Sequence, residues 1–192
     1  HRSLGVENEN TFVGEGISYC AVCDGAFYKG KTVAVIGGGN SALQDAVLLS
    51  ESCEKVTVVQ NLAYLTGESK LVKILEKRDN VDFIYSTVVK KILGGDEFCG
   101  IEIENTETGE TDMLALDGMF VAIGLIPQNE IFKENISLDD YGYVSADESC
   151  TTNAVGIFTA GDCRKKSIRQ ITTASADGAV AALAACRYID NK

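Results

Sequence analysis

The stretch TVAVIGGGNSALQDAVLLSESCEKVTVV, Thr32 to Val59, decides the fold class. Its first five residues, Thr32–Ile36, form an apolar, β-branched run that predicts a strand buried on both faces, as in a parallel sheet. Glycines break this strand, and apolar residues then recur at helical spacing from Ala42 to Leu49. A second strand is predicted over Lys55–Val59. These elements together make a β-turn-α-β unit, whose crossover is right-handed.

The chain continues this alternation and then changes character. A helix is predicted over Glu68–Lys77 and a strand over Val81–Ile84. Three β-prone runs separated by glycine-containing turns follow, and they predict an antiparallel meander: Thr87–Leu93, Phe98–Glu104 and Thr111–Leu116. A buried strand over Met119–Ile123 closes this part of the chain.

The predicted organisation is therefore an α/β fold. Residues 17–124 are expected to form a Rossmann-like, three-layer nucleotide-binding domain with a parallel sheet plus an antiparallel β-meander. Residues 1–16 have little periodicity and are interpreted as a connector. A boundary is placed near Ile126–Gln128, which contains the only proline of the chain. Residues 125–192 are expected to contain a short strand, Gly156–Thr159, and a long helix, Thr172–Ile189.

Composition excludes several classes of function. The formal net charge is −11 and the pI is about 4.5, which argues against binding to nucleic acid, since that binding needs clustered Lys and Arg. No apolar run is long enough to cross a membrane, and the N-terminus has no signal peptide. Seven irregularly spaced cysteines do not fit a secreted disulfide framework. We expect a cytoplasmic protein with one functional cysteine pair and five lone, buried thiols.

The sharpest local feature is the sequence Cys20-Ala21-Val22-Cys23-Asp24-Gly25. Two cysteines at this spacing can close a small disulfide ring, and a helix N-terminus can lower the pKa of one thiol. Asp24 is placed to carry the proton that thiol–disulfide exchange moves. The alternatives are half of a zinc site, which would need a second pair of ligands, and two thiols without a function. Redox chemistry is the favoured interpretation.

The second motif is Gly37-x-Gly39-x-x-Ala42, placed between a predicted strand and a predicted helix. Such a turn lets a dinucleotide's pyrophosphate approach the backbone, and Asn40 and Ser41 could cap the helix. The alternative is an ordinary glycine turn. After the second strand stand Gln60, Asn61 and Leu62, with neither the acid typical of NAD sites nor the arginine typical of NADP sites. The choice of dinucleotide stays open.

The order of motifs resembles that of low-molecular-weight thioredoxin reductases. The motifs that carry the resemblance are CAVCDG at 20–25, GGGNSA at 37–42, VAIG at 121–124, GIFTAGD at 156–162 and RQ at 169–170 before an alanine-rich helix. The resemblance extends from Gly5 to Ile189. It implies a flavoprotein with a discontinuous FAD-binding domain, into which the nucleotide-binding domain is inserted. Residues 1–16 would then connect from the FAD domain, and residues 125–192 would be the C-terminal part of that second Rossmann-like domain.

The resemblance also implies residue roles. Cys23 matches the cysteine nearer the flavin, Cys20 the one that attacks the partner's disulfide, and Asp24 the acid/base. The remaining matches are cofactor-binding residues: Gly37, Gly39, Asn40, Ser41, Ala42 and Gln60 for the dinucleotide, Gly161 and Asp162 for FAD, and Arg169, Gln170 and Ile171 beside the isoalloxazine ring. The implied activity is reduction of thioredoxin through FAD, with NADPH as donor and a homodimeric full-length protein.

Two departures from the family pattern stand out. The glycine-rich N-terminal FAD segment is not in this sequence, so we expect the isolated chain not to turn over and residues 127–192 to expose apolar surface. The family's His-Arg-Arg run is replaced by Gln60-Asn61-Leu62, and Asn40 stands where Asp is usual. NADPH, NADH and ferredoxin therefore remain alternative donors. A ferredoxin-dependent flavin thioredoxin reductase, an alkyl hydroperoxide reductase flavoprotein and a non-enzymatic nucleotide- or zinc-binding module remain alternative functions.

Overall fold

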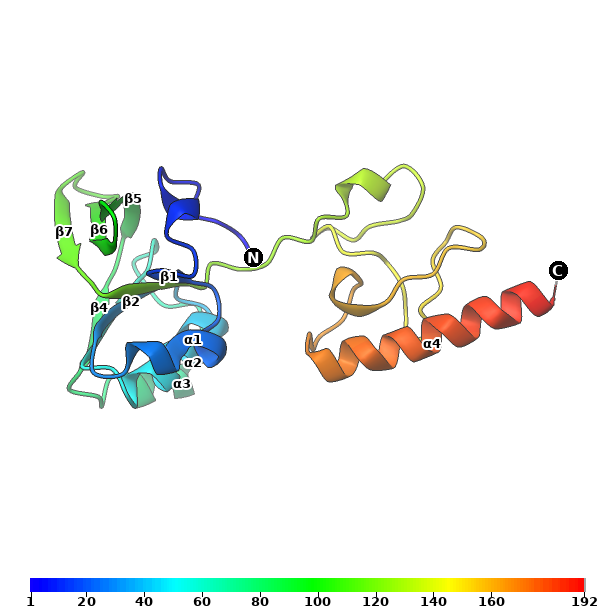
Figure 1. The fold of residues 1–192 in the computed structure, drawn as a ribbon, viewed down its shortest axis with the longest axis horizontal. Coiled ribbons are helices and arrows are strands. Elements are labelled where there is room, and N and C mark those ends of the chain that lie inside the picture. Colours follow the sequence, from blue (N-terminus) through cyan, green and yellow to red (C-terminus); the bar gives the residue numbers. More distant parts are fainter. Residues whose placement is uncertain (192) are drawn as a thin grey trace. The chain divides into compact units, whose positions relative to one another are not determined.

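A computed structural model describes residues 1–191 of the chain. Residues His1–Gly124 form one compact unit, and a second unit begins at Leu125 (Figure 1). We call these the first unit and the second unit and describe each by itself.

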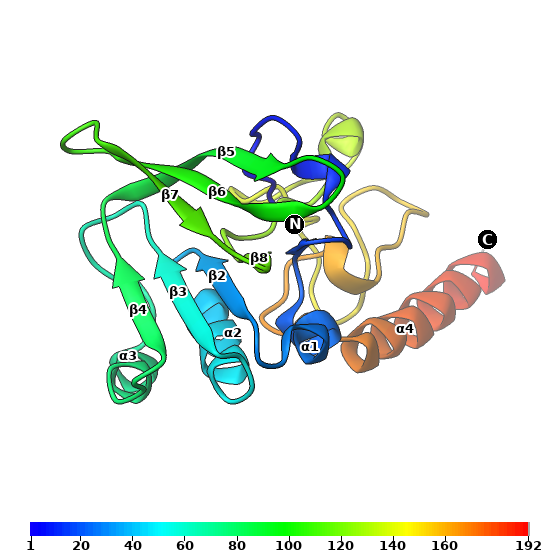
Figure 2. The same cartoon turned by 60° about the vertical axis from the view of Figure 1, so that its left-hand side comes forward.

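A parallel sheet forms the centre of the first unit (Figure 2). Its strands lie in the order β1-β8-β2-β3-β4, and every neighbouring pair is parallel. Their bounds are β1 Ile17–Ser18, β2 Thr32–Ile36, β3 Lys55–Val59, β4 Val81–Ile84 and β8 Gly118–Val121. The predicted parallel sheet is confirmed, since the continuous apolar runs at β2 and β3 bury both faces of the sheet.

Three helices cover one face of this sheet (Figure 2): α1 Ala21–Asp24, α2 Asn40–Ser50 and α3 Ser69–Leu75. Val33 and Val35 of β2 point into this layer, where they pack in one cluster with Leu43 and Leu49 of α2. Successive side chains of a strand alternate between faces, so Ala34 and Ile36 belong to the opposite layer.

The opposite face is covered by the antiparallel meander (Figure 2). It consists of β5 Thr87–Gly94, β6 Phe98–Asn105 and β7 Thr111–Ala115. Ile92 of β5 and Ile101 of β6 are buried against Ile36 and Met119 of the parallel sheet. The three-layer α/β architecture is thus confirmed, and the two cores hold the ends of the parallel strands in place.

The N-terminal residues pack closely within the first unit. A short 3₁₀ helix, η1, spans Glu9–Thr11, and Phe12 is buried. The carboxylate of Glu9 accepts hydrogen bonds from the backbone N–H groups of Leu4 and Gly5, both at 2.9 Å, and from the Tyr19 hydroxyl at 2.7 Å. Burial and the Glu9 hydrogen bond raise the pKa of Tyr19 to about 12. A single buried acid thus organises a segment that has no hydrophobic periodicity.

The second unit contains one long helix, α4 Ile171–Asp190, and the 3₁₀ helices η3 Glu130–Phe132 and η4 Gly161–Cys163. The predicted helix over Thr172–Ile189 is confirmed. The predicted strand over Gly156–Thr159 is wrong, because only an isolated antiparallel bridge joins Phe158 to Thr151. A strand exists only where a neighbour accepts its backbone hydrogen bonds over several residues, and the described residues provide one bridge there.

Most of the surface of α4 is exposed, and Asp177 is its only buried residue. The exposed fractions of Ile171, Leu183 and Ile189 are 86%, 60% and 67%. The expected exposure of apolar surface in this part of the chain is confirmed. Among residues 1–191, no helix combines the length and the apolar character needed to span a bilayer.

Candidate functional site

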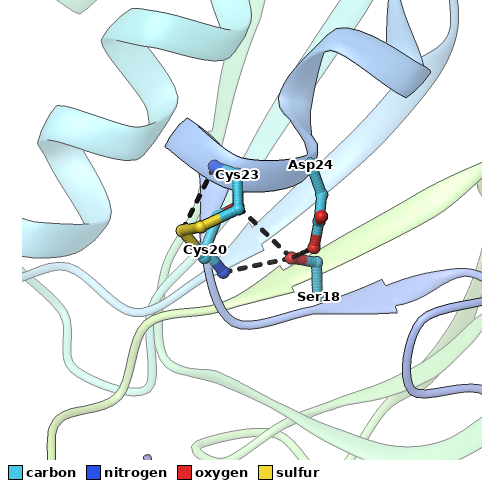
Figure 3. The surroundings of a disulfide bond; sticks show 4 residues. All are labelled: Ser18, Cys20, Cys23 and Asp24. Carbon is cyan, nitrogen blue, oxygen red and sulfur yellow. Dashed lines mark hydrogen bonds between the residues drawn. A yellow bond between two sulfur atoms is a disulfide. The ribbon is translucent and has the colours of Figure 1, made fainter.

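The cysteine pair forms a disulfide at the start of helix α1 (Figure 3). Cys20 is the N-cap residue of this helix, with extended backbone, and Cys23 lies within its single turn. This turn brings the two Cα atoms to 5.3 Å, and the backbone N–H of Cys23 donates to Sγ of Cys20 at 3.2 Å. Cys23 is exposed and Cys20 is half-buried, so the sulfur atoms lie at the surface of the first unit.

Ser18 connects the disulfide to Asp24 (Figure 3). Its hydroxyl donates to Oδ2 of Asp24 at 2.6 Å and accepts from the backbone N–H of Cys20 at 3.0 Å. Sequence reasoning identified Asp24 but missed Ser18. The available signal was a polar residue at a strand position, two residues before the first cysteine, which the structure shows to be buried.

The surroundings of the disulfide combine anchored and exposed apolar groups. Ala21 is buried in the helix-side core and holds α1 against the sheet. Val22 and Phe27 are instead 83% and 74% exposed. Val22, which lies between the two cysteines in the chain, adds exposed apolar surface at the disulfide.

The remaining cysteines do not all behave as expected. Cys53 and Cys150 are buried, as predicted for lone thiols, but Cys99 and Cys186 are exposed and Cys163 is half-buried. Cys99 is exposed at a register shift of the β5–β6 pairing, where Leu93 pairs with Gly100 and Gly94 with Phe98, so that Cys99 has no partner in β5. Cys186 lies on the largely exposed α4. The expectation that all five are buried is therefore wrong.

The glycine turn after β2 is built by close packing. Gly37 has φ +127°, and a Cβ placed on it would come within 2.5 Å of the backbone oxygen of Ala122 and 3.3 Å of Cβ of Ala42. Gly39 is the N-cap residue of α2, without a side-chain cap. The prediction that Asn40 and Ser41 cap the helix is wrong, because they already lie inside it.

A hydrogen-bonded pair fixes the entrance of α2. Asn40 donates through Nδ2 to Oε1 of Glu68 at 3.2 Å, and its Oδ1 accepts from the backbone N–H of Glu68 at 2.7 Å. The backbone N–H groups of Thr66 and Gly67 donate to the carbonyl oxygen of Gly38, both at 2.9 Å. The loop after β3 is thereby held against the glycine turn.

A cavity of about 570 Å³ opens above this turn, at the carboxyl ends of β2, β3 and β8. Sequence-predicted residues Gly37, Gly39, Asn40, Ser41 and Gln60 all line it, whereas Ala42 lies buried in the core beneath. Its other lining residues are Arg2, Leu4, Ile36, Gly38, Val59, Asn61, Leu62, Thr66, Thr87–Val89 and Ala122–Gly124.

The turn and the helix N-terminus fit a dinucleotide's pyrophosphate, since they combine free N–H groups, a helix dipole and glycines that let the ligand approach.

In the second unit, Asp177 organises the predicted FAD-contacting turn. Its carboxylate accepts hydrogen bonds from the backbone N–H of Gly161 at 2.9 Å, from Nε and Nη2 of Arg164 at 2.8 Å each, and from Nζ of Lys166 at 2.7 Å. The Arg164 hydrogen bonds hold the pKa of Asp177 well below its usual range. Sequence reasoning missed this cluster, because its members are spread over residues 161–177.

The remaining predicted residues lie at the start of α4. The guanidinium of Arg169 lies 3.9 Å from the ring centre of Tyr143, and its Nε is buried without a hydrogen-bond partner among residues 1–191. Gln170 is the N-cap residue of α4, and Ile171 is exposed. An orphaned donor beside an aromatic ring fits an additional polar, planar group, so these residues fit a flavin cofactor.

Residues 1–191 contain no group of three or more His, Cys, Asp or Glu side chains arranged to hold a metal ion. The cysteine pair stands instead as a disulfide.

Comparisons with known proteins agree with this geometry. The family model described as "Pyridine nucleotide-disulphide oxidoreductase" matches residues 1–178. The chain is 42% identical to the "34.2 kDa protein in rubredoxin operon" of Clostridium pasteurianum and 40% identical to a thioredoxin reductase of Listeria monocytogenes, covering 100% and 99% of this chain. It superposes on a thioredoxin reductase structure from Streptococcus pyogenes with a TM-score of 0.82 and 39% identity, over 100% of this chain and 63% of that one.

The chain spans 62% and 60% of the length of the two curated relatives. The match to the family model nevertheless covers both the glycine turn and the cysteine pair. The chain belongs to the pyridine nucleotide-disulphide oxidoreductase family.

Proposed function

We propose that this chain is the nucleotide-binding and disulfide-exchanging part of a thioredoxin reductase. The observation that carries the proposal is the surface disulfide of Cys20 and Cys23 with Ser18 and Asp24 behind it. The Listeria monocytogenes relative and the Streptococcus pyogenes structure, both called thioredoxin reductases, support it.

The exchange step uses the reduced pair. The thiolate of Cys20 attacks one sulfur of the partner's disulfide, which forms a mixed disulfide and releases the partner's second sulfur as a thiolate. The thiolate of Cys23 then attacks Sγ of Cys20, which re-forms the Cys20–Cys23 bond and releases the partner as a dithiol. Two electrons and two protons pass to the partner.

The surrounding groups prepare the pair for this step. The backbone N–H of Cys23, which donates to Sγ of Cys20, stabilises negative charge on that sulfur. Asp24 exchanges protons with the sulfur atoms, and Ser18 orients its carboxylate. Exposed Val22 and Phe27 supply apolar contact area for the partner.

Two cofactors belong to the proposal. FAD would be held by Gly161, Asp162, Arg169, Gln170 and Ile171, and a reduced dinucleotide by the glycine turn and its cavity. When bound, these groups supply the two electrons that open the Cys20–Cys23 disulfide.

The exchange step can be tested on the chain without cofactors. The chain is reduced with dithiothreitol, freed of reductant and mixed anaerobically with oxidised thioredoxin. We expect one thioredoxin disulfide to be reduced per chain. Cys23→Ser should accumulate a mixed disulfide through Cys20, whereas Cys20→Ser should not.

The matched control is Cys99→Ser, which removes an exposed cysteine that lies outside the pair. It should transfer electrons as the unaltered chain does. Transfer that persists when both Cys20 and Cys23 are replaced by serine would disprove the proposal. In the FAD-loaded holoenzyme, the same double replacement should abolish thioredoxin reduction.

The remaining parts of the proposal concern the whole protein. We propose a cytoplasmic homodimer that acts on thioredoxin, with reduced ferredoxin as an alternative donor to a nicotinamide dinucleotide. Anaerobic mixing of the holoenzyme with NADPH, NADH or reduced ferredoxin, followed by bleaching of the flavin absorbance, distinguishes these donors.

A further inference from the structure

The cavity above the glycine turn has nearly neutral walls. Arg2 is the one charged residue among those that line it, within the described residues 1–191. At the carboxyl end of β3 the wall consists of Gln60, Asn61, Leu62 and Thr66, which are all uncharged.

The sheet order places Arg2 and this neutral wall on opposite sides of the glycine turn. The turn follows β2, whose two neighbours in the sheet are β8 and β3. The backbone N–H of Arg2 donates to the carbonyl oxygen of Gly124, just beyond β8, at 2.9 Å. In a Rossmann-type site the adenosine ribose lies at the end of the second strand, which here is β3. The ribose therefore lies on the side away from Arg2.

The loop after β3 is fixed by its own hydrogen bonds. Gln60 is 4% exposed, and its Nε2 donates to the carbonyl oxygen of Tyr64 at 3.1 Å while its Oε1 accepts from the backbone N–H of Asn61 at 3.2 Å. A Cβ on Gly38 would lie 2.6 Å from Cδ of Gln60, so this side chain packs directly on the glycine turn. The loop is preformed, and its side chains contribute no cation.

A negative charge lies beside this rim. Glu68 carries it, held beside the first residue of α2 by its two hydrogen bonds with Asn40. A ribose 2′-phosphate carries about −1.5 to −2 charges at neutral pH. Removing such a group from water without a cationic partner is unfavourable, and a carboxylate nearby adds repulsion.

We propose that the cavity selects a dinucleotide with a free 2′-hydroxyl, so that the electron donor is NADH rather than NADPH, and that Asn61 and Leu62 determine this specificity. This inference rests on the proposed function, because it names the donor for the same disulfide. The family's fold implies NADPH, and the residues at the end of β3 do not fit its 2′-phosphate.

Isothermal titration calorimetry of the chain with ADP-ribose and with 2′-phospho-ADP-ribose tests the proposal without any turnover. ADP-ribose should bind more tightly by roughly tenfold or more, because a 2′-phosphate here lacks the charge-assisted hydrogen bonds of an arginine. Equal binding of both, tighter binding of the phosphorylated compound, or binding of neither would overturn the proposal.

A gain of affinity tests the two specificity residues. Leu62→Arg and Asn61→Arg should each tighten binding of 2′-phospho-ADP-ribose by roughly tenfold to a hundredfold, with little change for ADP-ribose. The control is Ala63→Arg, which adds the same charge to the same loop outside this cavity. An equal gain in the control would overturn the assignment of these residues.

The exchange assay with dithiothreitol-reduced chain separates this inference from the proposed function. Nucleotide selectivity can fail while thioredoxin is still reduced through Cys20 and Cys23, in which case only the donor is wrong. Loss of the exchange reaction would instead disprove the proposed function. The binding preference would then be judged from the calorimetry alone.

Discussion

At the scale of single residues, Ser18 has the most specific local role. It is buried, and its hydroxyl serves both the Asp24 carboxylate and the backbone of Cys20. Replacement by alanine removes the hydrogen bonds of this hydroxyl with Asp24 and with the backbone N–H and carbonyl of Cys20, and it leaves the Asp24 carboxylate without the Ser18 donor. Because hydrogen bonds to charged groups are stronger than neutral ones, Ser18→Ala should lower the free energy of unfolding by about 1.5–3 kcal/mol, measured by urea titration of the oxidised chain.

Ser50→Ala is the matched control for this change. Ser50 is equally buried, but its hydroxyl donates only to the carbonyl oxygen of Val47, one turn earlier in α2. Its removal should cost less than about 1 kcal/mol. Ser18→Ala should also slow exchange with thioredoxin, whereas Ser50→Ala should not. Equal effects in the two variants would contradict the positioning role of Ser18.

Asp177 gives the second unit a dependence on pH. Its folded-state pKa lies below the unfolded value of about 3.9, so ionised Asp177 stabilises the unit above that pH. This contribution is lost as the pH falls below about 4 toward the folded-state pKa. Backbone NMR signals of α4, followed against urea, should therefore show a lower midpoint at pH 3 than at pH 7.

Asp177→Asn should cost about 3–5 kcal/mol at pH 7, because it leaves the buried charges of Arg164 and Lys166 without their shared partner. The midpoint of this variant should also change less between pH 7 and pH 3. Asp140→Asn, an exposed acid in the same unit, should leave the curve unchanged. A midpoint in Asp177→Asn that falls with pH as steeply as in the unaltered chain would contradict this explanation.

At the scale of elements, the strand–turn–helix at 32–50 contains two glycines with different roles, one needed for packing and one for ligand approach. Gly37 has positive φ and touches the backbone of Ala122, so Gly37→Ala should lower the free energy of unfolding by about 1–3 kcal/mol. Gly39 has φ −86°, and its added Cβ would meet only Thr66 Oγ1 at 3.7 Å. Gly39→Ala should change stability by less than about 0.5 kcal/mol.

For nucleotide binding the expectation is reversed: Gly39→Ala, which should hardly change stability, should weaken binding of the folded molecule. A methyl group on Gly39 lies at the N-terminus of α2, where the pyrophosphate approaches the backbone, so Gly39→Ala should weaken ADP-ribose binding in calorimetry. If Gly39→Ala binds ADP-ribose unchanged, the ligand does not approach this turn.

The elements that could be predicted are those with strong internal signals. Apolar, β-branched runs predicted β2 and β3, helical spacing predicted α2, and an alanine-rich segment predicted α4. Prediction was weaker where an element needs a pairing partner from another part of the chain. The Gly156–Thr159 run forms only one isolated bridge, between Phe158 and Thr151. Two hydrogen-bonded groups could not be predicted from periodicity: the contacts of Ser18, and those of the Glu9 carboxylate that organises residues 4–19. Each joins residues that are not related by helical or strand spacing.

At the scale of the whole molecule, the exposed apolar surface of α4 predicts self-association. Ile171, Leu183 and Ile189 are all more than half exposed. Sedimentation velocity should show association of the chain that increases with concentration, since burial of these side chains removes apolar surface from water.

Leu183→Glu should weaken this association, because it places a charge on the apolar surface. The control is Val155→Glu, which changes an equally apolar but 85% exposed loop residue of the same unit. A monomeric chain at all concentrations would show that α4 does not mediate association, and equal effects of the two variants would show that general charge is responsible.

The sequence by itself determined the layered α/β fold, the glycine turn and the cysteine pair, because these depend on the order of residues close together in the chain. Only the tertiary structure decided how side chains distant in sequence meet: Asn40 with Glu68, and Asp177 with Gly161. It also decided which wall of the cavity is neutral, since sheet order rather than sequence order places Arg2 and Leu62 on opposite sides. Charge and hydrogen bonding act through space, and that space is defined only once the strands have paired.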